Sequence, residues 1–207
     1  MTCRIDHLVI TAADLASGAE FVRRALGVAL EAGGEHTRMG THNRLLKLGD
    51  SAYLEVIAPD PRAAKPERPR WFQLDDPEWI SRPRLATWVV RTTGLRSTLS
   101  AASEPLGEIE PMSRGELRWL LTIPADGNLP FGGAAPALIE WNGPHPAPRL
   151  RDSGCSLINL EIFHPQADRI SALLESISFE GDVSVAPERP GLLAHLQTPD
   201  GSRVRLG

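Results

Sequence analysis

The feature that most constrains the fold is an internal repeat. Three times the chain runs through a strand pattern, a short amphipathic helix and a string of strand patterns, over residues 3–60, 83–145 and 151–207. Because each such unit leaves a sheet face that a neighbour must cover, a repeat of this kind predicts how the units pack together. It predicts an α+β fold built from three tandem βαβββ modules.

The first copy shows the pattern most fully. Its opening segment RIDHLVIT alternates as a strand does, with Ile5, His7 and Val9 on one face. Asp14 is a suitable N-cap for the helix that follows, and Gly27 is a suitable stop. In the third copy the clearest helical stripe has apolar residues three and four apart, namely Ile170, Leu173, Leu174 and Ile177.

Composition excludes several classes of protein. The hydrophobic fraction of 42% and the charged fraction of 23% are those of an ordinary globular chain with a substantial core. A net charge of −4 without a basic stripe gives no reason to expect nucleic acid. No apolar run approaches the roughly 20 residues that cross a membrane.

The cysteines and the start of the sequence indicate a cytoplasmic protein. Cys3 and Cys155 match no metal or redox spacing and are expected to be reduced thiols. Met1 leads almost directly into a strand pattern, which leaves no room for a signal peptide.

Residues 61–82 interrupt the repeat and form a predicted linker. The segment is rich in proline and arginine, and its Trp71, Phe72 and Trp79 are expected to pack onto the body of the protein rather than contact a ligand. Further along, the glycine-rich ADGNLPFGG lacks phosphate-loop spacing, so it is interpreted as a turn. No nucleotide cofactor is predicted.

Polar residues intrude at corresponding points of the repeat. His7 lies inside the first strand of the first copy, and Glu55 and Glu140 lie in the closing strands of the first and second copies. A strand histidine is often a hydrogen-bonded core residue, and a strand glutamate often faces solvent. Their recurrence at related positions favours a shared site.

Several segments together resemble one superfamily. DHLVITAADLASGAEFVRRALG, GTHNRLLKLGDSAYLEVIAPDP and PALIEWNGPHP are similar to the glyoxalase-like domain proteins of the vicinal oxygen chelate (glyoxalase/bleomycin resistance/dioxygenase) superfamily. The resemblance covers most of residues 4–147. It implies a glyoxalase-like domain over residues 1–150, in which the first two modules pair and their curled sheets form a cleft. The third module, 151–207, follows it.

The resemblance also implies a metal site in that cleft. Its ligands would come from the first and last strands of each module, which gives His7, Glu55 and Glu140. Thr87 stands where metal-binding members usually have histidine, with Ala86 and Trp88 as neighbouring alternatives. In the third copy, Leu160 and Arg205 take the two positions, so that copy is expected to be structural.

The implied chemistry is Lewis-acid catalysis by a divalent metal. One imidazole and two carboxylates suit Mn²⁺, Fe²⁺, Ni²⁺ or Zn²⁺, and three protein ligands leave positions for a substrate with vicinal oxygens. Glu140 or Glu55 is the candidate base. Further candidates for substrate contact are the polar and aromatic residues of strands that would line the cleft, Thr87, Asn43, His42, Arg118 and Trp119. Solvent exposure or turn capping is the alternative for His42 and Asn43, as it is for His36.

These observations favour a small-molecule enzyme, a metal-dependent lyase or isomerase with dioxygenase as a further option. The alternative is a protein of the same fold that binds or sequesters a small molecule without catalysis, and Thr87 in place of histidine favours it. A relict cleft in an assembly protein is a third reading. The third module is expected to pack on the first pair or to form a homodimer with its twin.

Overall fold

The computed structural model describes residues 2–207, and its chain follows the predicted element order. The first half of the main sheet comes from β1 (Arg4–Thr11), α1 (Leu15–Leu26), β2 (Glu31–His36), β3 (Thr41–Leu48) and β4 (Ala52–Pro59). The second half comes from β5 (Arg84–Arg91), α2 (Leu95–Ala101), β6 (Glu108–Arg114), β7 (Leu117–Ile123) and β8 (Ala137–Trp141). Both follow the order strand, helix, three strands.

The sequence signals at α1 act as expected. The side chain of Asp14 accepts a hydrogen bond from the backbone N–H of Ser17 at 2.8 Å, which satisfies a donor that the first turn leaves free. Gly27 ends the helix in the left-handed region, at φ 71°, where a residue without Cβ is favoured. These caps set where the chain leaves the helix for β2.

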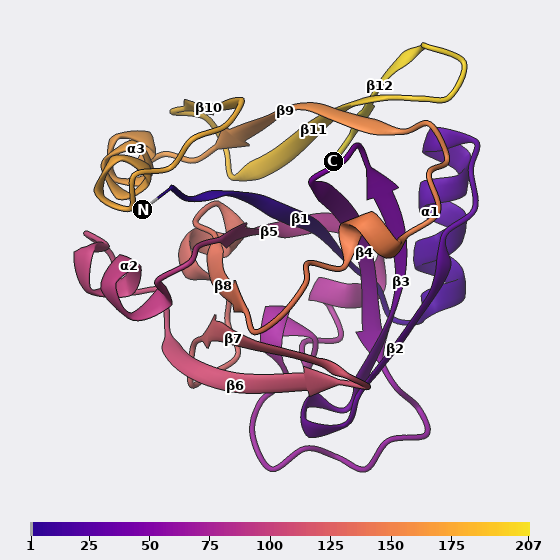
Figure 1. Cartoon of the computed structure of the whole chain (residues 1–207), viewed down its shortest axis with the longest axis horizontal. Helices are drawn as coiled ribbons and strands as arrows, with labels where there is room; N and C mark the ends of the chain where they lie inside the picture. The colour runs from indigo at the N-terminus through magenta and orange to yellow at the C-terminus, as the bar shows by residue number, and fades with distance from the viewer. Residues whose placement is uncertain (1) are drawn as a thin grey trace.

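Two halves build one eight-stranded sheet that curls around its inner face (Figure 1). The strand order is β2-β3-β4-β1-β5-β8-β7-β6. β1 and β5 are antiparallel at the centre, and each is parallel to the closing strand of its own half. The halves are therefore related by an approximate two-fold axis between β1 and β5. This is the paired, curled-sheet arrangement predicted for the first two modules.

The two faces of the central strands have different neighbours. The outer face carries residues such as Leu8, Leu54 and Trp88, which are fully buried. The inner face carries His7, Glu55 and Thr87 among apolar residues such as Val9 and Ile139. Because successive side chains of a strand point to opposite faces, the inner face gathers the polar residues into one place.

The third segment has the predicted elements but not the predicted topology. It comprises β9 (Ser156–Phe163), α3 (Ala167–Ser176), β10 (Val183–Ala186), β11 (Gly191–Gln197) and β12 (Arg203–Leu206). Its strand order is β10-β9-β11-β12, so β9 is parallel to the second strand of its unit rather than the last. The segment is therefore not a spatial copy of the first two. Leu160 and Arg205 consequently do not correspond to the ligand positions of the first two modules.

This four-stranded sheet covers the outer face of the main sheet (Figure 1). Leu160, Ile162 and Leu196 join Leu8 and Trp88 in one apolar cluster. The N-terminal strand adds a short parallel bridge between Cys3 and Phe179. Packing on the first pair, one of the two arrangements expected for this segment, is thus what the chain adopts. A division into two domains at residue 150 remains a prediction.

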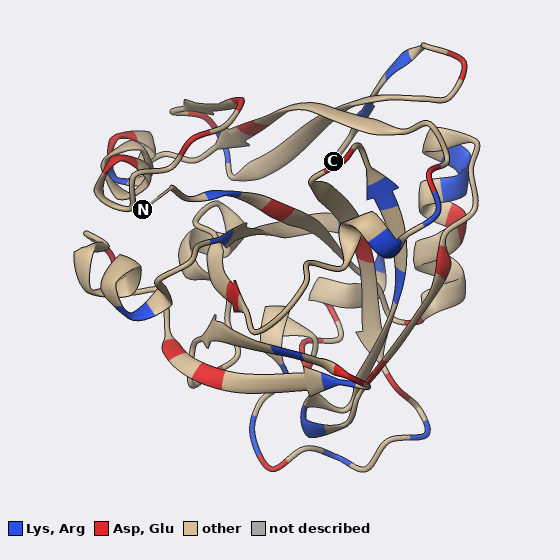
Figure 2. Ribbon diagram, viewed as in Figure 1, with Lys and Arg blue, Asp and Glu red and all other residues tan. Residues whose placement is uncertain are grey.

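Charges are interspersed over the surface. Figure 2 shows basic and acidic residues side by side on the strands and on the long loop before β5. In that loop Arg62 pairs with Glu35 at 2.6 Å, and Arg68 pairs with Glu110 at 2.5 Å. Cys3 and Cys155 are buried and form no disulfide. Among the described residues, no helix has the length and apolar character needed to span a bilayer.

Candidate active site

An irregularity in β1 creates the site. In the pairing of β1 with β5, Ile5 lies opposite Val90 and His7 opposite Val89, so Asp6 is an extra, unpaired residue. Such a bulge bends the strand and re-aims side chains. It brings the carboxylate of Asp6 to the imidazole of His7, although neighbouring strand residues normally point apart.

Asp6 is fully buried and binds three donors. Its Oδ1 lies 2.6 Å from Nδ1 of His7, and its Oδ2 lies 2.9 Å from both Nε1 of Trp141 and Nε2 of His145. Burial acts to raise the pKa of Asp6, but the hydrogen bonds from His145 and His7 outweigh it and hold that pKa well below its usual range. The residue is an anion at neutral pH.

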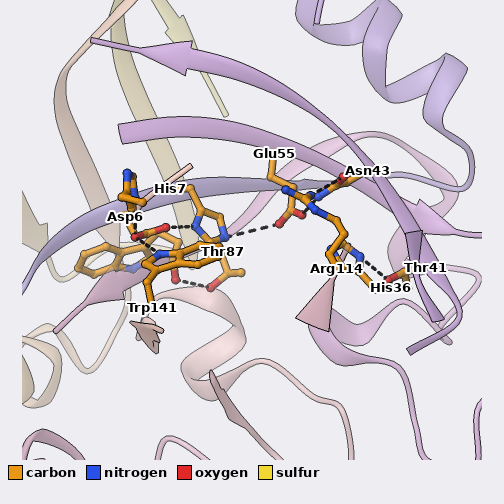
Figure 3. A network of polar contacts seen from close by, with 11 residues as sticks. Asp6, His7, His36, Thr41, Asn43, Glu55, Thr87, Arg114 and Trp141 are labelled. Atoms are coloured by element: carbon orange, nitrogen blue, oxygen red, sulfur yellow. Dashed lines mark hydrogen bonds and ion pairs between the residues drawn. The ribbon is translucent and has the colours of Figure 1, made fainter. Parts of the chain in front are cut away.

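His7 lies between two carboxylates (Figure 3). Its Nε2 lies 3.5 Å from Oε2 of Glu55, on the side away from Asp6. Burial acts to lower the pKa of His7, but hydrogen bonds to Asp6 and Glu55 raise it to about 9. For Glu55, burial acts to raise the pKa and the contact with His7 lowers it to about 2. At neutral pH an imidazolium therefore bridges two carboxylates.

Asn43 and Arg114 extend this chain of contacts. Nδ2 of Asn43 donates to Oε1 of Glu55 at 2.5 Å, while Oδ1 of Asn43 accepts from Nη1 of Arg114 at 2.9 Å. Oδ1 also accepts from the backbone N–H of Gly34 at 2.8 Å. At Gly33 a Cβ would lie 1.9 Å from that oxygen, so the close passage of β2 requires glycine there. Asn43 thus holds one carboxylate oxygen and orients a guanidinium.

A narrow pocket, open to solvent on one side and with about 30 Å³ of free space, lies against these groups. Its polar lining includes His7, His36, Tyr53, Glu55 and Arg114, and its apolar wall comprises Trp71, Phe72, Trp119, Leu121, Ile139 and Trp141. The ring of Tyr53 stacks on His7 with centroids 4.5 Å apart. The predicted linker packs on the body as expected, but its Trp71 and Phe72 also form a wall of the pocket.

His36 is a neutral base in this pocket. Its Nδ1 lies 3.1 Å from Oγ1 of Thr41, and its ring packs edge-on against Trp71. Burial lowers the pKa of His36 to about 4. The pocket therefore contains one charged and one uncharged imidazole at neutral pH, because their surroundings shift the two pKa values in opposite directions.

The prediction that Glu140 joins His7 and Glu55 is wrong. Oε2 of Glu140 accepts a hydrogen bond from the backbone N–H of Leu95 at 2.7 Å, at the start of α2. Ile139 and Trp141, its neighbours in β8, line the pocket, and alternation sends Glu140 to the other face. Glu140 satisfies a free donor of a helix N-terminus instead.

The strand register shows which residues of the two halves correspond. In the antiparallel pairing His7 lies opposite Val89 and Val9 opposite Thr87, so the two-fold axis relates His7 to Thr87. This register supports Thr87, and not Ala86 or Trp88, as the residue at the position equivalent to His7. Val9 pairs with Glu55 and Val89 with Ala137, so the counterpart of Glu55 is Ala137.

The four positions therefore do not form the metal site that the resemblance implies. Two carry donors, His7 and Glu55, whereas Ala137 has none and the hydroxyl of Thr87 donates to the carbonyl of Gly133 at 3.2 Å. Among the described residues, no three His, Cys, Asp or Glu side chains are placed to hold a metal ion together. The chain's own residues do not fit a three-ligand metal centre.

The remaining candidates divide into two groups. Trp119 lines the pocket and Asn43 contacts Glu55, while contact of either residue with a substrate remains a prediction. His42 lies outside it, with Nδ1 4.0 Å from Asp60. Arg118 is exposed and donates to the carbonyls of Gly115 and Leu117 in a hairpin turn, so the arginine of the pocket is Arg114.

Sequence reasoning missed Asp6 and Tyr53 and placed the arginine wrongly. Asp6 directly precedes the strand histidine, but a bulge leaves no mark in a single sequence. Tyr53 lies two residues before Glu55, and this spacing does place both on one face of a strand. Arg114 comes from β6, at the far edge of the sheet, and only the curl of the sheet brings it to Asn43.

Together these features define a class: a paired βαβββ sheet with a polar pocket on its inner face. The Glyoxalase_3 family model, described as a glyoxalase-like domain, matches residues 5–177. The chain belongs to this glyoxalase-like family. A search of curated proteins gives no match.

One solved structure shares the fold at low sequence identity, and others are more distantly similar. A hypothetical protein from Staphylococcus aureus is 14% identical, with a TM-score of 0.60, over 99% of this chain and 85% of that one. Methylmalonyl-CoA epimerase of Streptomyces coelicolor, bound to 2-nitronate-propionyl-CoA, is 19% identical with a TM-score of 0.43, over 68% of this chain and 98% of that one. The epimerase of Mycobacterium tuberculosis is 18% identical with a TM-score of 0.42, over 66% and 85%.

Proposed function

We propose that the chain is a small-molecule enzyme that moves a proton on a substrate with vicinal oxygens, as an isomerase or lyase does. The observation that carries the proposal is the buried Asp6–His7–Glu55 chain beside an aromatic pocket. Pairs of titratable groups whose surroundings push their pKa values apart are typical of acid and base partners.

Glu55 is the proposed base and His7 the proposed acid. Glu55 removes a proton from a carbon beside a carbonyl group, and the electron pair of the broken C–H bond moves to the carbonyl oxygen. His7, with its pKa raised to about 9, donates Nε2–H to that oxygen and stabilises the enolate. Return of the proton from Glu55, to the same or an adjacent atom, completes an isomerisation.

Substrate binding also activates the base. In the free protein Glu55 is a weak base because the His7 cation lowers its pKa to about 2. That contact is long, with 3.5 Å between Nε2 of His7 and Oε2 of Glu55. A substrate oxygen that takes over Nε2–H weakens this stabilisation, so that burial raises the pKa of Glu55 above its value in the free protein.

The pocket walls indicate the class of substrate. Arg114 presents a guanidinium suited to a carboxylate, and Trp119, Trp141 and Phe72 suit an apolar or aromatic group. A 2-oxo acid with an apolar or aromatic substituent combines these features. The predicted divalent metal enters no step, because Ala137 and Thr87 occupy two of its four positions without offering a free donor.

Deuterium exchange tests the proposal. Phenylpyruvate in D₂O is followed by proton NMR at its C3 position, with a protein-free sample as the background. The wild-type protein is expected to accelerate exchange, and Glu55→Gln to lose about 10²–10⁴-fold of that acceleration. Glu140→Gln is the matched control and keeps it, because Glu140 lies on the other face of β8.

The alternative, a protein that binds or sequesters a small molecule, has a distinct signature. It gives saturable binding of aromatic 2-oxo acids with no exchange above background, and Glu55→Gln then changes affinity alone. The predicted cytoplasmic location and homodimer form part of the proposal, and light scattering at micromolar concentration tests the dimer by its mass.

A further inference from the structure

A second pocket lies beside the first on the inner face of the sheet. It is a narrow crevice with only about 10 Å³ of free space as the chain stands, and its lining includes Thr87, Leu106, Ile123, Leu129 and Ala137. Trp71 and Phe72 line both pockets. These two rings, stacked with centroids 5.4 Å apart, are thus a shared wall between the two spaces.

The approximate two-fold axis relates this pocket to the polar one. Its Thr87 corresponds to His7 and its Ala137 corresponds to Glu55, by the register of β1, β4, β5 and β8. Where the first half carries an acid and a base, the second half therefore carries a hydroxyl and a methyl group. Equivalent places in the two halves therefore carry titratable groups in one and a mainly apolar lining in the other.

The polar groups of the second pocket are already engaged. The hydroxyl of Thr87 donates to the carbonyl of Gly133 at 3.2 Å, and that of Thr122 accepts from the backbone N–H of Leu138 at 2.8 Å. Asn128, an exposed residue of the lining, donates from Nδ2 to Oδ2 of Asp126 at 2.8 Å, and the rest of the lining is aliphatic and aromatic. Once opened, such a lining suits a hydrocarbon group, and it has no charge to hold an ionic one.

The shared wall belongs to a strained turn. Phe72 and Gln73 have φ values of 56° and 58°, in the region that side chains with Cβ disfavour. The turn is closed at its base by Arg70, whose Nη1 lies 2.6 Å from Oδ1 of Asp75. The indole N–H of Trp71 is buried without a hydrogen-bond partner. A movement of the turn would therefore relieve backbone strain and let the indole N–H of Trp71 reach a hydrogen-bond partner.

We propose that the two pockets are one bipartite binding site, in which the Trp71–Phe72 turn swings aside to admit an aliphatic tail. The head of the substrate, a 2-oxo acid, sits against His7, Glu55 and Arg114, and its tail enters the pocket of Thr87 and Ala137. This deepens the proposed function and rests on it for the chemistry of the head group.

Affinity across a chain-length series tests the proposal. Linear 2-oxo acids from pyruvate to 2-oxooctanoate are titrated against the protein by tryptophan fluorescence. Each added methylene that enters the second pocket is expected to tighten Kd about fourfold. Ala137→Leu fills that pocket and is expected to remove the gain for the long acids while leaving the affinity for pyruvate unchanged.

Leu129→Ala is the complementary variant, since it enlarges the same pocket and is expected to favour longer tails. The thermal melting curve of Ala137→Leu shows whether that variant folds. If it does not, Leu129→Ala still tests the proposal. A Kd that does not vary with chain length overturns the bipartite site, as does length dependence that neither variant alters, or failure of every acid to bind.

Exchange and affinity separate the two proposals. Deuterium exchange with a Kd that is independent of chain length overturns the bipartite site alone. A Kd that tightens with chain length in an Ala137-dependent way, with no exchange in any acid, overturns the proposed chemistry and leaves the bipartite site in place.

Discussion

Nδ1 of His7 lies 2.6 Å from Oδ1 of Asp6, its immediate neighbour in β1. Both side chains are buried on the same side because Asp6 is the extra residue of a bulge. Asp6 thereby fixes the ring of His7 and leaves Nε2 directed at Glu55. A positioning carboxylate behind an imidazole is a device that keeps the ring oriented and cationic.

Replacement of Asp6 is expected to destabilise the fold. Asp6→Asn leaves the His7 cation with one carboxylate partner and replaces an acceptor shared by Trp141 and His145. Loss of one member of a buried ion pair costs on the order of 3 kcal/mol in the free energy of unfolding. Urea denaturation at pH 7 measures it. Glu180→Gln, which breaks the exposed pair with Arg4, is the control and should cost under about 1 kcal/mol.

The free energy of unfolding is expected to reach its maximum near pH 6.5. The raised pKa of His7, about 9, gives stability that is complete below 6.5 and lost as the pH rises to 9. The lowered pKa of His36, about 4, makes stability fall as the pH drops from 6.5 to 4. Glu55 adds a loss between its ordinary pKa of 4.5 and about 2.

Denaturation curves from pH 4 to 9.5 test this pH profile. One proton contributes a slope of at most about 1.4 kcal/mol per pH unit. His7→Gln is expected to flatten the alkaline arm and to leave the acid arm, which belongs to His36. An unchanged alkaline arm in that variant would show that His7 is not held as a cation.

Arg114 is expected to bind the carboxylate of the substrate. Arg114→Met should weaken the Kd of pyruvate by about tenfold or more, because a charge-assisted hydrogen bond is lost. Arg118→Met is the matched control, since Arg118 is exposed and serves only a hairpin turn. Isothermal titration compares the two. Equal Kd values for both variants would remove Arg114 from the site.

Glu140 is expected to support α2 and not the pocket. Glu140→Ala removes the acceptor for the backbone N–H of Leu95 and should lower the free energy of unfolding by about 1 kcal/mol. The Kd of pyruvate should not change. A loss of pyruvate binding in a folded Glu140→Ala protein would contradict the placement of this side chain on the outer face.

The two-fold register predicts how to build a metal site. Thr87→His together with Ala137→Glu places His and Glu at the positions that correspond to His7 and Glu55. The double variant is expected to bind Zn²⁺ or Mn²⁺ at least tenfold more tightly than the wild-type protein, measured by titration calorimetry. Wild-type affinity equal to that of a folded double variant would refute the register argument.

Much of the fold was predictable from local signals. The alternation in RIDHLVIT, the cap at Asp14 and the stop at Gly27 mark β1 and α1 because they depend on neighbouring residues alone. The third segment shows the limit of this reasoning. Its element order is repeated, but which strand pairs with β9 depends on long-range contacts that leave no periodic mark.

The sequence by itself determined the strand alternation around His7, because successive side chains of a strand point to opposite faces, and its family resemblance implied that Glu55 shares a site with His7. Only the tertiary structure decided the rest of the site. A bulge added Asp6, register replaced Glu140 by Ala137, and the curl of the sheet brought Arg114 to Asn43. These three features depend on a shift of one to three residues or on a contact between distant strands. Tertiary packing, and not the local sequence pattern, decides which register and which contact have the lowest free energy.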